Sequence, residues 1–123
     1  MKNLYKTSAL VILGLFFLLN ICFAQDTYVA DLYTVKAGNF AHGQLEAHYL
    51  KHGYQFGQIT QEQYLKGAQT LLDAAPGADI LEKTRRNGDI EHFKVSTGEF
   101  AVMTKRGRIR TYFKTDYGYW LRR

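Results

Sequence analysis

The fold is decided by residues 80–114, ILEKTRRNGDIEHFKVSTGEFAVMTKRGRIRTYFK. Apolar and polar side chains alternate along most of this stretch, which is typical of β-strands with one face on a core. Turn signals interrupt the alternation, and one of them, Asn87-Gly88, is the strongest short signal for a tight hairpin. The sequence therefore predicts an antiparallel meander of four strands, over residues 80–86, 90–95, 99–104 and 108–114.

Two helices are predicted directly before these strands. The first covers about residues 40–53 and ends at Gly53, a stop signal. The second begins at Thr60, which forms a capping box with Gln63, and it ends before Pro76-Gly77. We therefore expect an α+β fold, with two N-terminal helices packed on a four-stranded antiparallel β-meander. The apolar face of the second helix is formed by Tyr64, Leu65, Ala68, Leu71 and Leu72.

Residues 1–24 are predicted to be a cleavable signal peptide, because a positive start is followed by an apolar run and small residues end at Ala24. An uncleaved membrane anchor is the alternative, although the apolar run is short for a span, which needs about 20 residues. The only cysteine, Cys22, lies in this leader, so the mature chain has no disulfide. We expect a secreted or periplasmic monomer without stable membrane association, with a lead-in over residues 25–41 and one domain over residues 42–123.

Charge is divided unevenly along the chain after the leader. Residues 25–82 carry three Lys/Arg and seven Asp/Glu, a net charge of −4, whereas residues 83–123 carry eleven Lys/Arg and four Asp/Glu, a net charge of +7. Such clustering fits a surface that binds a polyanion. It fits a solvated basic sheet face equally well.

The last predicted strand shows the same ambiguity. Strict alternation puts Arg108, Arg110, Tyr112 and Lys114 on one side and Ile109, Thr111 and Phe113 on the helix side. The first set forms a cationic stripe with an aromatic ring that would stack a base. The alternative is a solvent-facing strand that is protected from aggregation by its charges.

The first predicted helix carries two histidines one turn apart, His48 and His52, with Lys51 beside them. A nearby cation favours the neutral imidazole, which acts as a general base near pH 7. We do not predict a metal site, because no third ligand stands at a convincing spacing and His42 and His92 are isolated. The carboxylates Asp89, Glu91 and Glu99 have no obvious partner in the sequence.

Four short motifs, in this order, resemble the C-terminal toxin modules of bacterial polymorphic and contact-dependent toxins. They are more distantly similar to colicin D-like nuclease domains, within the barnase/EndoU/colicin/RelE-like ribonuclease fold. The chain departs from the pattern at Thr115, where these modules usually have proline, and in carrying its own leader. The motifs are Lys51-His52-Gly53-x-x-Phe56-Gly57, Thr84-Arg85-Arg86-Asn87-Gly88-Asp89, Thr97-Gly98-Glu99-Phe100-Ala101-Val102 and Gly107-x-Ile109-Arg110-Thr111-Tyr112-Phe113-Lys114.

The resemblance implies a toxin that cuts RNA, with tRNA as one candidate substrate, and that needs neither metal nor cofactor. It also implies an immunity protein as a partner. Its motifs place the catalytic groups at His52, Arg85, Thr111 and Lys114. We expect the substrate to be bound by His48, Lys51, Arg110 and Tyr112.

Two predictions disagree about the Thr111 hydroxyl. Alternation along the strand turns it toward the helices, whereas the resemblance places it at the catalytic site. Either a bulge rotates Thr111, or the active cleft lies at the edge between helix and sheet, within reach of His52. Two alternatives to catalysis also stay open. The protein would then be a secreted, non-catalytic binding module for a polyanion or a protein partner, or a decayed toxin domain kept as a decoy.

Overall fold

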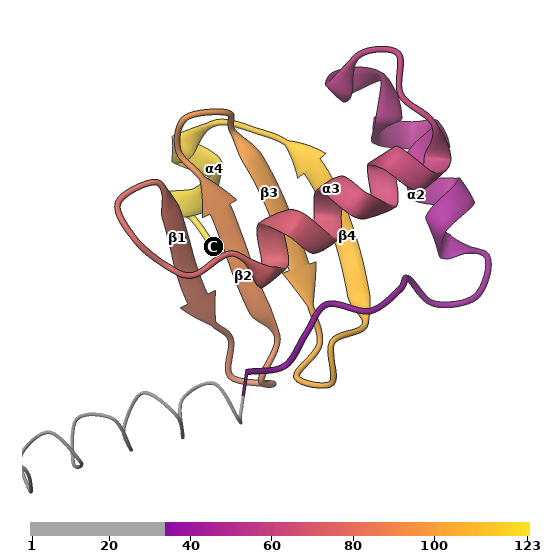
Figure 1. Ribbon diagram of the computed structural model, residues 1–123. Coiled ribbons are helices and arrows are strands. Elements are labelled where there is room, and N and C mark those ends of the chain that lie inside the picture. The colour runs from indigo at the N-terminus through magenta and orange to yellow at the C-terminus, as the bar shows by residue number, and fades with distance from the viewer. Residues whose placement is uncertain (1–33) are drawn as a thin grey trace, which may run out of the picture. The chain divides into compact units, whose positions relative to one another are not determined.

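The structure is a computed structural model that describes residues 34–123 (Figure 1). The predicted signal peptide and most of the predicted lead-in lie outside these residues. Within the described part, no helix is long and apolar enough to cross a membrane. The elements are α2 (Gln44–His52), the 3-10 helix η1 (Gly53–Phe56), α3 (Gln61–Asp73), β1 (Ile80–Thr84), β2 (Ile90–Lys94), β3 (Glu99–Met103), β4 (Ile109–Lys114) and α4 (Tyr117–Leu121).

The predicted α+β class is confirmed. The four strands form one antiparallel sheet in the order β1-β2-β3-β4, a meander in which each strand pairs with the next. The helices before the sheet occupy residues 44–73, in the middle of the chain rather than at its N-terminus. A further short helix, α4, follows the sheet and was not predicted.

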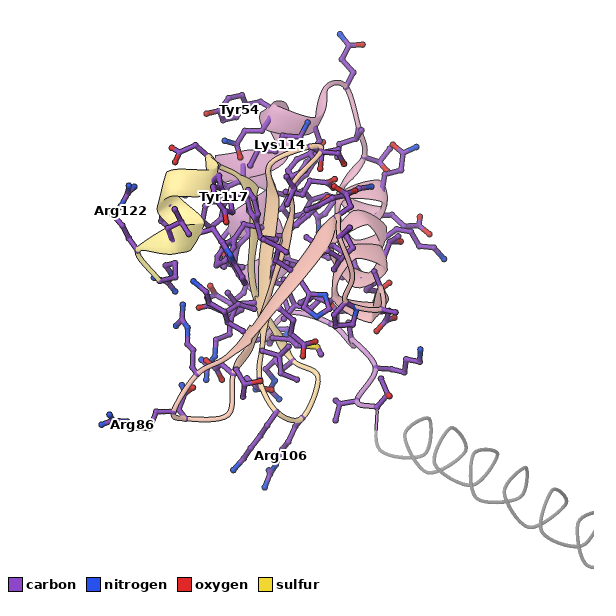
Figure 2. All side chains as sticks on the ribbon, turned by 90° about the vertical axis from the view of Figure 1, so that its left-hand side faces the viewer. Tyr54, Arg86, Arg106, Lys114, Tyr117 and Arg122 are labelled. Atoms are coloured by element: carbon purple, nitrogen blue, oxygen red, sulfur yellow. The ribbon has the colours of Figure 1, made fainter. Side chains whose placement is uncertain are left out.

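Helix α3 crosses one face of the sheet, while α4 lies on the other (Figures 1 and 2). The predicted capping box is confirmed: the Thr60 side chain accepts a hydrogen bond from the Gln63 amide, and the Gln63 side chain accepts one from the Thr60 amide. The buried face of α3 packs on apolar side chains of β3 and β4. This helix-side core is formed mainly by Phe40, Tyr64, Ala68, Leu71, Leu72, Ala101, Met103, Ile109 and Tyr112.

Two buried polar side chains on the helix side, Tyr64 and His92, are hydrogen-bonded to other elements. The Tyr64 hydroxyl donates to the Tyr112 carbonyl, and burial raises the pKa of Tyr64. The His92 ring is buried, with Nδ1 2.8 Å from the Leu71 carbonyl and Nε2 2.7 Å from a Glu82 carboxylate oxygen. These bonds connect α3 to β2 and β1, so they fix the helix across the sheet.

Helix α4 covers part of the opposite face. The Asp116 side chain caps it by accepting from the Tyr119 amide. The Trp120 ring stacks on Phe93 with centroids 5.8 Å apart, and the Lys83 ammonium lies 4.2 Å from the Trp120 ring centroid. The aromatic tail therefore serves packing, and it closes a second, smaller cluster formed by Phe93, Phe100, Val102 and Trp120.

A β-bulge changes which side chains of β4 share a face. The register between β3 and β4 shifts at Val102/Met103, so that Ile109 pairs with Met103 and Thr111 pairs with Val102. Arg110 is the extra residue, and the two-residue period is broken at this point. The predicted alternation is therefore wrong: Ile109 and Tyr112 face the helices together, while Thr111 and Phe113 face the α4 side.

The outer edge of β4 is covered at three positions. At one end, the Ile109 amide donates to the Asn39 carbonyl at 3.0 Å, and Phe40 forms an isolated parallel bridge with Ile109. In the middle, the Tyr112 carbonyl accepts from Tyr64. At the other end, the Gln55 side chain bonds both the amide and the carbonyl of Lys114, at 3.0 and 3.2 Å. These contacts hold α2 and η1 beside β4.

Candidate functional site

His52 lies at the C-terminus of α2, beside the edge of β4. Its ring is half-buried and stacks on Phe113, with ring centroids 5.1 Å apart. Phe113 in turn packs with the cluster on the α4 side of the sheet. The imidazole is thus neither sealed in the interior nor on the opposite side of the molecule from the last strand.

The pKa of His52 is lowered from 6.5. The first cause is burial, and the nearby charges of Lys51 and then His48 add to it. Lys51 itself is exposed on α2, so it acts on the ring as a fixed positive charge. The ring is therefore neutral at pH 7 and carries a free lone pair, as a general base requires.

His48 lies one turn before His52, and their ring centroids are 6.1 Å apart. On its other side, the His48 ring packs on Phe40 at 5.2 Å. Within residues 34–123, its buried Nδ1 has no hydrogen-bond partner. Burial, followed by the charge of Lys51, lowers the pKa of His48 as well. The two imidazoles are thus neutral neighbours in a row of rings that ends on β4.

The bulge brings Arg110 and Thr111 to the α4 side of β4. Arg110 is half-exposed, and its Nε lies 2.7 Å from a carboxylate oxygen of the buried Asp89. Thr111 is two residues from Phe113 on the same face, roughly 7 Å along the strand. The bulge resolves the conflict over Thr111: its side chain lies on the face that Phe113 shares and that His52 contacts.

Lys114 and Tyr112 lie on the helix side instead. The Lys114 ammonium is 5.5 Å from the Phe56 ring centroid. The Tyr112 ring is 2% exposed, stacks on Phe56 at 4.5 Å, and donates its hydroxyl to Glu99. The prediction that Tyr112 would stack a base from an exposed stripe is therefore wrong, because the bulge turns this ring into the core.

Arg85 lies toward the opposite edge of the sheet. It follows β1, which is three strand spacings, roughly 14 Å, from β4. Its guanidinium pairs with Glu91, a carboxylate on β2 that is 1% exposed and also lies 3.2 Å from Arg123 Nη2. The structure does not bring Arg85 next to His52. It also gives Glu91 and Asp89 arginine partners that the sequence did not reveal.

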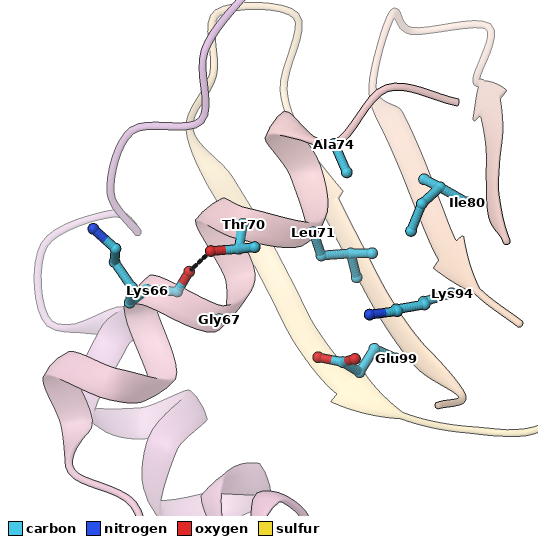
Figure 3. A pocket seen from close by; sticks show the side chains of 8 residues that line it. All are labelled: Lys66, Gly67, Thr70, Leu71, Ala74, Ile80, Lys94 and Glu99. Atoms are coloured by element: carbon cyan, nitrogen blue, oxygen red, sulfur yellow. Dashed lines mark hydrogen bonds between the residues drawn. The ribbon is translucent and has the colours of Figure 1, made fainter. Parts of the chain in front are cut away.

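Two other features lie apart from these residues. Within the described chain, no group of three His, Cys, Asp or Glu side chains is arranged to hold a metal ion. A pocket of about 250 Å³ opens between α3 and the ends of β2 and β3, with an apolar floor flanked by Lys94 and Glu99 (Figure 3). None of the predicted site residues line this pocket.

Comparison with known proteins does not identify the chain: no family model matches it, and no curated protein matches it. The resemblance to ribonuclease toxins therefore depends on the motifs in this sequence alone. The candidate site consists of His52 with Lys51 and His48 on α2, and of Arg110 and Thr111 on the α4 side of β4. We call this group the β4 site.

Proposed function

We propose that the protein is a ribonuclease that cuts RNA without a metal ion and acts as a secreted toxin. The observation that carries the proposal is the position of His52. A neutral imidazole lies against Phe113, on the strand that turns Arg110 and Thr111 to the same face. A base, a fixed cation and a hydroxyl donor within one strand length suit attack on a phosphodiester.

In the proposed reaction, His52 takes the proton from a ribose 2′-hydroxyl. The 2′-oxygen forms a bond to the adjacent phosphorus as the bond from phosphorus to the 5′-oxygen breaks, and the leaving oxygen takes a proton from water. The products are a 2′,3′-cyclic phosphate and a free 5′-hydroxyl. DNA lacks the nucleophile and is not cut.

Arg110 and Thr111 would bind the phosphate in this scheme. A guanidinium and a hydroxyl donate to the non-bridging oxygens, where negative charge develops, and such a donor contributes about 3–4 kcal/mol when it is well placed. Arg85 follows β1 at the opposite edge of the sheet, and Lys114 lies on the helix side over Phe56, so the proposal assigns the phosphate to the β4 site. An immunity protein remains part of the proposal as a partner.

The decisive test replaces His52 with Ala. Loss of the general base should lower the rate of RNA cleavage by about 100- to 10,000-fold, with the far-ultraviolet spectrum and thermal unfolding retained. His42→Ala is the matched control, because that histidine is exposed in the turn before α2. Undiminished cutting by a clean His52→Ala preparation would show that the imidazole has no catalytic role.

A binding module without catalysis is the second candidate. It is favoured by the number of cations at the hairpin ends, several of them far from His52. Such a module would bind RNA in a salt-dependent way and leave no 2′,3′-cyclic ends. Analysis of the ends of treated RNA separates the two functions, as does the toxicity of the leaderless chain when it is made inside a cell.

A further inference from the structure

Two hairpins meet at the end of the sheet remote from Lys114, and both carry cations. The β1–β2 turn contributes Arg86, and the β3–β4 turn contributes Lys105, Arg106 and Arg108. The labelled side chains of Arg86 and Arg106 point outward from this end, away from the labelled Lys114 (Figure 2). We call these four residues the turn cluster.

The two turns are adjacent, and a hollow of about 400 Å³ lies between them. A Cβ atom added at Gly88 would be 3.2 Å from the Lys105 side chain, which shows how close the turns come. The charged side chains that line the hollow are one carboxylate, Asp89, and four cations. The cations are Lys105, Arg106, Arg108 and Arg110.

The single carboxylate does not neutralise the turn cluster. Asp89 is buried and is engaged by Arg110. Within residues 34–123, no hydrogen bond or ion pair engages the side chains of Arg86, Lys105, Arg106 and Arg108. Four exposed cations in one place repel each other, and an anion at the hollow would relieve this repulsion.

The turn cluster is continuous with the β4 site. From Phe113, where His52 stacks, the strand runs back past Thr111 and Arg110 to Arg108. These five residue steps span roughly 16 Å. A stacked nucleic-acid strand advances about 3.4 Å per nucleotide, so this distance corresponds to about five nucleotides.

We propose that the turn cluster is a second phosphate-binding subsite, which holds the backbone of single-stranded RNA about five nucleotides from the bond at His52. The inference rests on the proposed function and specifies its substrate: an RNA segment long enough to lie along β4. Arg110 lies between the two ends of this path, and its bond to Asp89 holds it there.

The test measures the affinity of the purified full chain for 2′-O-methyl oligonucleotides of three and eight nucleotides. These probes lack a free 2′-hydroxyl and are not cut, so the result does not depend on catalysis by His52. The octanucleotide should bind about 10-fold more tightly than the trinucleotide, because it alone reaches the turn cluster.

The variant for this test is the double substitution Arg106→Gln with Arg108→Gln, which should weaken octanucleotide binding about 10-fold and trinucleotide binding less than about 2-fold. The slope of log affinity against log salt should fall by about 1.4, or about 0.7 for each lost contact with a single strand. Lys66→Gln with Arg122→Gln removes the same charge from other exposed positions and should change neither value.

Equal affinity for the two lengths, or equal losses in the two double variants, would overturn the proposal. It would also be overturned if a heparin octasaccharide, but not the octanucleotide, bound tightly and depended on Arg106 and Arg108. The cluster would then serve a sulfated polysaccharide. Undiminished cleavage by His52→Ala, with this length dependence retained, would instead contradict the catalytic role of His52 alone.

Discussion

The two faces of the sheet differ in what their polar groups do. On the α3 side, Tyr64 and His92 are buried and bonded to backbone carbonyls of other elements. On the α4 side, the polar groups are ion pairs: Glu91 with Arg85 and Arg123, and Asp89 with Arg110. A nine-residue apolar core covers the first face, and a five-residue helix covers only part of the second.

This difference separates the residues that stabilise the fold from those to which we assign the proposed function. Helix α3, which is bonded to β4 and to β2, fixes the first face, and the buried polar groups of Tyr64 and His92 are engaged by other protein groups there. The second face keeps a charged side chain at the surface of β4, at Arg110, on the same strand as Phe113, which the His52 ring contacts. Substitutions on the two faces should therefore have different effects, and the following experiments measure that difference.

The largest effect is expected for Tyr64→Ala. The side chain is fully buried between α3 and β4, so its loss removes apolar contact and the bond to the Tyr112 carbonyl. The free energy of unfolding should fall by about 3–5 kcal/mol. Trp120→Ala on the other face should cost less, about 3 kcal/mol, because the C-terminal helix detaches without opening the main core. Urea unfolding of both variants measures the two free energies. A larger loss for Trp120→Ala would show that the α4 face, and not the α3 face, contributes more to stability.

The next effect concerns the buried ion pairs. Glu91→Gln leaves Arg85 and Arg123 without their carboxylate. Their side chains are 36% and 31% exposed, so water screens the unpaired charges. We therefore expect a loss of about 2 kcal/mol, below the about 3–5 kcal/mol of a fully buried pair. Glu46→Gln, at an exposed carboxylate of α2, is the control and should change unfolding by less than about 0.5 kcal/mol. Equal effects would mean that the α4 face does not depend on Glu91.

The smallest effect is a shift in pH dependence. Because the pKa of His52 is lowered, the acid limb of kcat/KM should lie below pH 6.5. Lys51→Gln removes the second cause of that shift but leaves burial, so the limb should move upward while staying below pH 6.5. Lys66→Gln on α3 is the matched control and should leave the limb in place. A downward shift in Lys51→Gln would contradict the electrostatic role of Lys51.

The same histidines give the sign of the stability change with pH. Their pKa values are lowered in the folded state, so the unfolded chain binds more protons as the pH falls below 6.5. The free energy of unfolding should therefore decrease in that range, and His52→Ala should reduce the decrease.

Local signals in the sequence were sufficient for most of the fold. Thr60 and Gln63 cap α3 as predicted, and the Asn87-Gly88 turn joins β1 to β2. The strands end within two residues of their predicted bounds. Each of these features depends on neighbouring residues, so a single sequence is enough to read it. Helix α4 was missed, although Asp116, three residues before the Tyr119 amide that it caps, is a helix-start signal.

The site was harder to predict, because it depends on contacts between distant residues. The bulge at Arg110 results from the pairing of β4 with β3, and alternation within β4 alone cannot reveal it. Tyr112 was therefore placed on the wrong face. The partners of Glu91 lie six and 32 residues away, and no spacing rule connects them. His52 lies beside the last strand, because Phe113 lies next to α2 in the fold.

The closure of β4 by Asn39, Tyr64 and Gln55 has a consequence for assembly. A sheet grows when another chain bonds to an open edge strand, and this edge has outward groups at Ile109, Tyr112 and Lys114 occupied. Among residues 34–123, no strand pairs with the far side of β1. A second molecule that pairs its backbone with this sheet is therefore expected to bind at β1, the edge opposite His52.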